Sequence, residues 1–142
     1  RILAALSNCR FALPPRKIVV NLAPAQLKKV GAGFDLPIAV ALLAAMGHCP
    51  AERLKKCLFA GELSLKGSLR SVRGVLPMAL MAWRQQLSQL VLPVANELEA
   101  VVVPELQRVP VKHLRDVIAF LRNEQDFPQT ELDAESLFQQ HQ

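Results

Sequence analysis

Side chains able to act as nucleophiles or general bases occur in this sequence without the spacing that catalysis requires. His48, His113 and His141 lie outside any recognisable signature of a Ser-His-Asp set, such as GxSxG. We therefore interpret them as surface imidazoles. Three hydroxyl residues surround a Lys-Gly pair, where turn and edge positions explain them without catalysis. These residues are Ser64, Ser68 and Ser71.

A glycine-rich segment precedes the most apolar part of the chain but lacks the features of a phosphate-binding loop. Gly31-Ala32-Gly33 resembles the start of a dinucleotide loop, yet Leu36 stands where the third glycine belongs. The sequence contains no Walker A motif. Asp35 is expected to cap the next helix and would repel an anion there, and Glu62 is expected in a strand. We predict neither nucleotide binding nor a catalytic carboxylate pair.

The three cysteines are odd in number and widely spaced, which favours a reducing cytoplasm over a disulfide framework. His48, Cys49 and Cys57 lack the CxxC or HxxxH spacing of a zinc site. We therefore expect buried thiols, Cys9 among them, and no bound metal.

Charge is unevenly distributed along the 142 residues, whose net charge is +5. Residues 1–73 carry 12 Lys and Arg against three acids, whereas residues 74–142 carry five against nine. The basic half is compatible with a polyanionic partner. The absence of a tight cluster interleaved with aromatic residues favours an ordinary solvated surface instead.

Hydrophobic patterning predicts a single α/β domain. Lys17–Leu22 reads as a buried strand, and Leu36–Met46 as a buried helix with Asp35 as its N-cap and Gly47 after its end. That apolar run is shorter than the roughly 20 residues of a membrane span, so no membrane segment is expected. Leu58–Leu65 and Ser68–Val72 are predicted to form a hairpin around Lys66-Gly67.

The second half predicts further helices and short strands, ending in a polar tail. The expected elements are a helix at Val75–Gln86, a strand at Leu90–Pro93, a helical turn at Asn96–Ala100, a strand at Val101–Pro104 and an amphipathic helix at Val111–Leu121. Residues 123–142 contain five acids, five Gln and no Lys or Arg, and they are predicted to be a linker.

Three long motifs, in order, resemble the N-terminal domain of the magnesium-chelatase-like, ComM-type family of AAA+ ATPases. They lie at Asn21–Ala25 with Gly31–Ala39, at Gly61–Arg70, and at Gly74–Pro77. The resemblance covers roughly residues 1–104. It implies a Lon-protease-like α/β fold, shared with a ribosomal protein domain, with a buried helix and a β-hairpin. Residues 1–122 would form this domain without its first strands, and residues 123–142 would lead to an AAA+ module.

The resemblance extends to Lon itself, whose catalytic Ser and Lys lie before the buried helix and after the hairpin. Aligned through Gly61-Glu62, these positions fall on Gly33 and Met78. A Ser-Lys dyad needs a hydroxyl and an amine of lowered pKa, which neither residue offers. We therefore expect no catalytic residue and no cofactor in this chain, with ATP and magnesium bound by the AAA+ module.

Family members of the ComM type are hexameric helicases that drive DNA branch migration during natural transformation. The resemblance thus implies a cytoplasmic accessory domain that organises the ATPase ring or guides DNA. Its candidate DNA contacts flank the two loops around the lost active site: Lys28, Lys29, Lys66, Arg70 and Arg73. Two alternatives remain open, a protein-protein module that binds through the hairpin and a peptidase with an unorthodox site.

Overall fold

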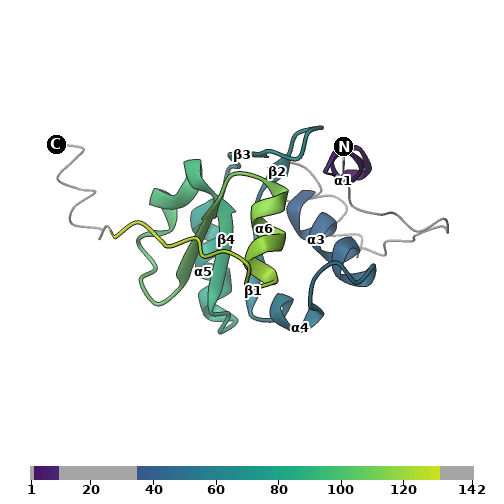
Figure 1. Ribbon diagram of the computed structural model, residues 1–142. Coiled ribbons are helices and arrows are strands. Elements are labelled where there is room, and N and C mark those ends of the chain that lie inside the picture. The colour runs from purple at the N-terminus through teal and green to yellow at the C-terminus, as the bar shows by residue number, and fades with distance from the viewer. Residues whose placement is uncertain (1, 10–34, 132–142) are drawn as a thin grey trace, which may run out of the picture.

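A parallel three-stranded sheet forms the centre of the molecule, seen in Figure 1. The structure is a computed structural model that describes residues 2–9 and 35–131. The strands lie in the order β1 (Cys57–Phe59), β4 (Gln89–Pro93) and β5 (Gln107–Val111), and both neighbouring pairs are parallel. Helices cover the two faces, as in other parallel sheets. The predicted strand Lys17–Leu22 lies outside the described residues.

Alternate residues of the central strand enter two separate hydrophobic clusters. Val91 joins a cluster built mainly from α1 (Ile2–Asn8), α3 (Asp35–Ala45) and α6 (Leu114–Leu121). Leu90 and Leu92 join the other cluster, against the helix α5 and the 3-10 helix η1. These two helices span Val75–Arg84 and Val94–Ala100. Because successive side chains of a strand point to opposite faces, the clusters lie on the two sides of the sheet.

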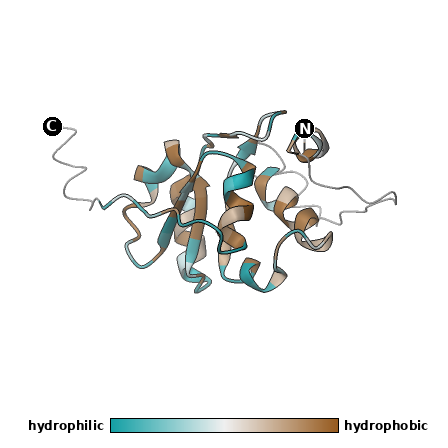
Figure 2. Ribbon diagram, viewed as in Figure 1, coloured by the Kyte–Doolittle hydropathy of each residue, from teal (hydrophilic) through white to brown (hydrophobic). Residues whose placement is uncertain are grey.

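Helix α3 is the apolar helix that the sequence predicts, and Figure 2 shows it almost entirely in the hydrophobic colour. Its end has the expected glycine: Gly47 adopts φ +83°, and the N–H of His48 bonds the carbonyl of Leu43. Asp35 is the first helical residue instead of the residue before the helix. Helix α4 (Ala51–Leu54) follows and leads into β1.

The predicted hairpin is shorter than expected, and its first half is divided between two sheets. Residues Cys57–Phe59 form β1 of the parallel sheet, whereas β2 (Glu62–Leu63) pairs antiparallel with β3 (Leu69–Arg70). The prediction of one continuous strand from Leu58 to Leu65 was therefore wrong. The bend falls at Ala60-Gly61, where the Ala60 N–H still bonds Val91 of β4 and the Gly61 carbonyl turns to Leu36.

The predicted strand at Val101–Pro104 was also wrong, because these residues form turns after η1. The edge strand is instead β5, which begins at Gln107 and contains Pro110. Register explains how the sheet accommodates proline: the Gln107 N–H points to Ser88 beside β4, so residue 110, three positions on, presents its nitrogen to the opposite side. Helix α6 consequently begins at Leu114 and not at Val111.

The chain after α6 contacts the body of the domain. Phe127 packs against the hydrophobic cluster that includes α3 and α6. The side chain of Gln129 accepts a hydrogen bond from Arg108 of β5, and the N–H of Thr130 donates one to Glu97 of η1. The linker assigned to residues 123–142 stays a prediction, and residues 132–142 lie outside the described part. In the described ranges, no helix is long and apolar enough to cross a membrane.

Candidate nucleic-acid interface

The β2–β3 hairpin ends in a tight turn held by its own serines. The hydroxyls of Ser64 and Ser68 lie 2.6 Å apart, and the Ser68 N–H donates to Ser64 Oγ at 3.1 Å. Backbone bonds from Ser64 to Ser68 and from Gly67 to Ser64 close the turn. Gly67 adopts φ +91°, which is open to glycine and costly for other residues. The interpretation of these serines as turn residues is thus consistent with their contacts.

Two elements from distant parts of the sequence, α1 and the start of α6, hold this turn in place. The side chain of Asn8 donates to the Leu65 carbonyl at 2.6 Å. His113 Nε2 lies 3.0 Å from the Lys66 carbonyl, and the Leu114 N–H bonds the Gly67 carbonyl at 2.8 Å. A carbonyl partner makes Nε2 the donor, so Nδ1 is free to accept the Arg115 N–H at 3.1 Å. His113 therefore caps α6 and anchors the hairpin together.

The base of the hairpin is fixed from inside the core. Asp35 is 5% exposed, and its Oδ2 accepts a hydrogen bond from the Leu63 N–H at 3.0 Å. The adjacent Leu36 N–H bonds the Gly61 carbonyl. The start of the buried helix thus sets the position of β2.

The structure brings three of the five predicted DNA contacts to the hairpin and the loop that follows it. Lys66 is exposed in the turn, Arg70 on β3 and Arg73 in the loop before α5. Lys28 and Lys29 lie outside the described residues. Arg70 pairs in register with Glu62, so an acidic residue lies across the hairpin from it and lowers the local positive potential.

Two further basic residues, Lys112 and Arg115, lie at the start of α6 beside the hairpin and are not among the predicted contacts. The Lys112 carbonyl accepts the Leu69 N–H of β3 at 2.8 Å, which fixes the start of α6 beside the hairpin. Both are exposed. Asp116 accepts the Lys112 N–H, so one carboxylate accompanies them. A strand predicted to end at Val111 would have placed both residues just after it, but Pro110 argues against a strand in this segment.

The loop between Arg70 and Arg73 is held by a buried amide. Asn96 of η1 is 2% exposed, and its side chain both accepts from the Val72 N–H and donates to the Val72 carbonyl, each at 2.9 Å. The two basic residues therefore extend from a backbone fixed on either side of Val72.

Of the two positions that correspond to the Lon dyad, the structure describes only Met78, which offers no reacting group. Met78 lies on α5, half-buried against the cluster shared with η1. Gly33 lies outside the described residues. A thioether has neither the proton nor the charge that a general base or acid requires.

The cysteines are buried thiols of low reactivity. Burial raises the pKa of Cys9, Cys49 and Cys57 above the ordinary value, and the neighbouring guanidinium groups of Arg115, Arg122 and Arg53 oppose this only in part. Since the thiolate is the nucleophile, these residues are not activated for catalysis. No group of three metal-binding side chains occurs within residues 2–9 and 35–131.

A polar cavity of about 500 Å³ lies at the opposite end of the sheet from the hairpin, beside the first residues of the parallel strands. Its lining includes Arg53, Lys56, Gln89 and Gln107. Ligand sites of open parallel sheets lie beyond the carboxyl ends of the strands instead. Of the sequence-predicted site residues that lie within the described ranges, none lines this cavity.

The parallel sheet, the buried helix and the antiparallel hairpin define an α/β domain of Lon-protease-like fold. In agreement, the chain is 29% identical over 105 residues to Lon protease from Endomicrobium trichonymphae, covering 70% of this chain and 13% of that protein. A family model described as subunit ChlI of Mg-chelatase matches residues 1–96. The chain belongs to this magnesium-chelatase-like family of AAA+ proteins, as the sequence motifs predicted.

Two relatives illustrate the relationship. The competence protein ComM of Haemophilus influenzae is 41% identical over 137 residues, which cover 96% of this chain and 27% of that protein. YifB of Escherichia coli is 38% identical over 121 residues, covering 85% and 24%. The chain thus spans about a quarter of the length of these relatives.

Proposed function

We propose that the chain is a non-catalytic accessory domain of a ComM-type AAA+ ATPase and that it guides DNA along its hairpin. The observation that carries this proposal is a group of exposed cations on a rigidly held backbone. The group, called the basic face below, consists of Lys66, Arg70, Arg73, Lys112 and Arg115.

Rigidity matters because a flexible basic loop loses conformational entropy when it binds, and a fixed one does not. The hairpin turn is bonded to His113 and the following loop to Asn96, so the backbone from which the basic side chains extend is fixed before DNA arrives. Such contacts would attract phosphates without reading sequence. Glu62 and Asp116 limit the strength of the attraction, as suits a domain that guides a moving strand.

The remainder of the proposal follows the family. ATP and magnesium would bind to an AAA+ module, assembled as a hexamer, and branch migration during natural transformation would be the activity of the whole protein. The half-buried Met78 supports the absence of peptidase chemistry from this domain. Buried, unpaired thiols at all three cysteines support a cytoplasmic location.

Fluorescence anisotropy with labelled single- and double-stranded DNA tests the DNA role. We expect binding at low salt that weakens steeply as salt rises, with a slope set by the number of phosphates contacted. Absence of binding to either DNA at low salt would remove the DNA role from this domain. Hydrolysis of an unfolded protein that survives replacement of Ser64, Ser68 and Ser71 would contradict the non-catalytic role.

A further inference from the structure

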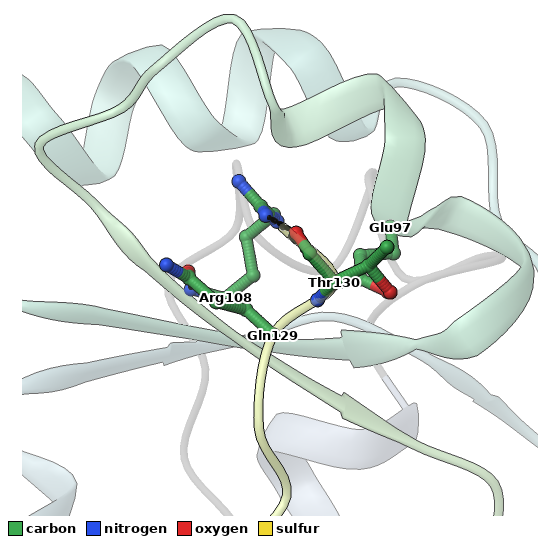
Figure 3. Close-up of polar contacts among 4 residues, drawn as sticks. All are labelled: Glu97, Arg108, Gln129 and Thr130. Atoms are coloured by element: carbon green, nitrogen blue, oxygen red, sulfur yellow. Dashed lines mark hydrogen bonds and ion pairs between the residues drawn. The ribbon is translucent and has the colours of Figure 1, made fainter. Parts of the chain in front are cut away.

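The chain leaving α6 completes a buried ion pair, as Figure 3 shows. Arg108 Nε of β5 lies 3.4 Å from Glu97 Oε2 of η1, and the two side chains are 5% and 6% exposed. The segment Phe127–Glu131, called the strap below, crosses this pair. Charges so shielded from water need further hydrogen bonds to offset their lost hydration.

The strap supplies those hydrogen bonds through one residue. The Thr130 N–H donates to Glu97 Oε2 at 2.6 Å, and its hydroxyl donates to Glu97 Oε1 at 2.8 Å. Arg108 Nη2 donates to the Thr130 carbonyl. Both charged partners are therefore satisfied in part by a residue that is itself exposed. Without the strap, the ion pair loses three hydrogen bonds.

The strap also protects the open edge of the sheet. The N–H of Arg108 faces away from β4 and donates to Gln129 Oε1 at 3.0 Å. Farther along the same edge, Pro110 has no N–H and the Lys112 N–H bonds Asp116. An edge strand with free N–H groups can pair with other chains. Along this edge, Pro110 has no N–H and Asp116 binds that of Lys112, which leaves the N–H of Arg108. The strap covers this N–H through Gln129.

The 3-10 helix η1 joins this strap to the basic face. Its adjacent residues Asn96 and Glu97 are both buried, at 2% and 4% exposure. Asn96 holds both backbone groups of Val72, in the loop between Arg70 and Arg73, while Glu97 holds Thr130. A shift of η1 must therefore disturb both contacts.

We propose that the strap is a releasable latch and that η1 couples its release to the loop carrying Arg70 and Arg73. The latch has two states, closed over the Glu97–Arg108 pair or open to water. Whatever moves the strap alters the order of the loop, and a ligand on the loop alters the strap by the same free energy. The latch itself does not depend on which polyanion the loop binds.

Amide hydrogen exchange measured by NMR tests the latch and the coupling separately. The probes are the amides of Thr130 and Arg108 for the strap, that of Val72 for the loop, and that of Val91 for the central sheet. Thr130→Val removes the hydroxyl bond to a buried carboxylate from an exposed position, so the domain is expected to fold. Exchange at the Arg108 and residue-130 amides should rise about tenfold, since a hydrogen bond to a charged group is lost.

Glu97→Gln is the stronger variant, and Glu105→Gln is its matched control on the exposed turn before β5. We expect Glu97→Gln to speed exchange at the strap probes most and at Val72 to a smaller degree, in each case by a larger factor than at Val91, because the buried Arg108 that is left unpaired also lowers the global stability. The control variant should leave all four probes unchanged. Unchanged amide exchange at the strap probes in Thr130→Val would overturn the latch. If both Thr130→Val and Glu97→Gln speed amide exchange at the strap probes but leave exchange at Val72 unchanged, the coupling is overturned. Equal acceleration at Val91 would show general destabilisation and overturn both.

Discussion

His113 joins two elements through the two nitrogens of one ring: Nε2 contacts the Lys66 carbonyl at 3.0 Å, and Nδ1 accepts the Arg115 N–H at 3.1 Å. The first contact fixes the hairpin turn and the second caps α6. Because the ring is neutral when one nitrogen donates and the other accepts, both contacts depend on a single tautomer. This imidazole thus links the hairpin turn, which carries Lys66, to the start of α6.

Replacing His113 should separate these two roles. His113→Asn keeps a capping side chain but is too short to reach Lys66, whereas His113→Ala removes both contacts. We expect unfolding in urea to show a loss of about 1 kcal/mol for His113→Asn and about 2 kcal/mol for His113→Ala. Equal stability of the two variants would mean that the cap contributes nothing.

Gly67 should tolerate alanine much less well than Gly47. Both adopt positive φ, +91° and +83°, so alanine is strained at either position. A Cβ at Gly67 would also lie 2.5 Å from Cys9 Sγ, whereas nothing lies within 4 Å at Gly47. We expect Gly47→Ala to cost about 1 kcal/mol of unfolding free energy and Gly67→Ala clearly more.

The clash is tested by combining Gly67→Ala with Cys9→Ala, which removes the sulfur. The double variant should lose less stability than the sum of the two single variants. Strict additivity would show that the backbone angle or the nearby His113 ring, and not the contact with Cys9, limits position 67.

The sequence predicts those elements whose local signals agree with their environment. Helix α3 has a continuous apolar run and a glycine at its end, and the hairpin turn has its Lys66-Gly67 pair. Strand β5 was missed because Pro110 argues against a strand, and only the register shows that its nitrogen faces outward. Val101–Pro104 is the more apolar run, so the sequence predicts the strand there.

The buried ion pair could not be predicted, because its partners are recognisable only in three dimensions. Arg108 and Glu97 are 11 residues apart in a strand and a helix, and each alone is typical of a solvated surface. The polar composition after residue 122 likewise predicts a linker, although Gln129 and Thr130 form hydrogen bonds with the buried residues Arg108 and Glu97. Of the basic face, Lys66, Arg70 and Arg73 are predicted because they flank a loop around the lost active site of the family. Lys112 and Arg115 are recognised only through the contact between β3 and the start of α6.

Removing one partner of the Glu97–Arg108 pair should destabilise the domain strongly. Arg108→Met leaves Glu97 buried without its cation, and we expect a loss of about 3 to 5 kcal/mol in urea unfolding. Combining it with Glu97→Met replaces both charges with apolar side chains and should recover most of the loss. A double variant no more stable than Arg108→Met alone would contradict the assignment of the loss to an uncompensated charge.

Stability should fall in alkaline solution, in part because of the buried thiols. Burial raises the pKa of Cys57 above its ordinary value of 9.0, so an unfolded chain ionises this thiol while the folded one keeps it neutral. The contribution is therefore complete below pH 9.0 and decreases as pH rises toward the folded-state pKa. Urea unfolding across this range should show a shallower pH dependence for Cys57→Ala than for the unaltered protein. Identical slopes would show that this thiol is not the cause.

The most direct test of the account is DNA binding by two variants of equal charge. One replaces Lys66, Arg70 and Arg73 with Gln. The control replaces Lys55, Lys56 and Arg84, which are exposed on segments that precede the parallel strands, at the end of the sheet away from the hairpin. Anisotropy titration at low salt should show at least a tenfold loss of affinity, and a smaller salt slope, for the first variant only. Equal losses in the two variants would mean that net charge, and not the basic face, attracts DNA.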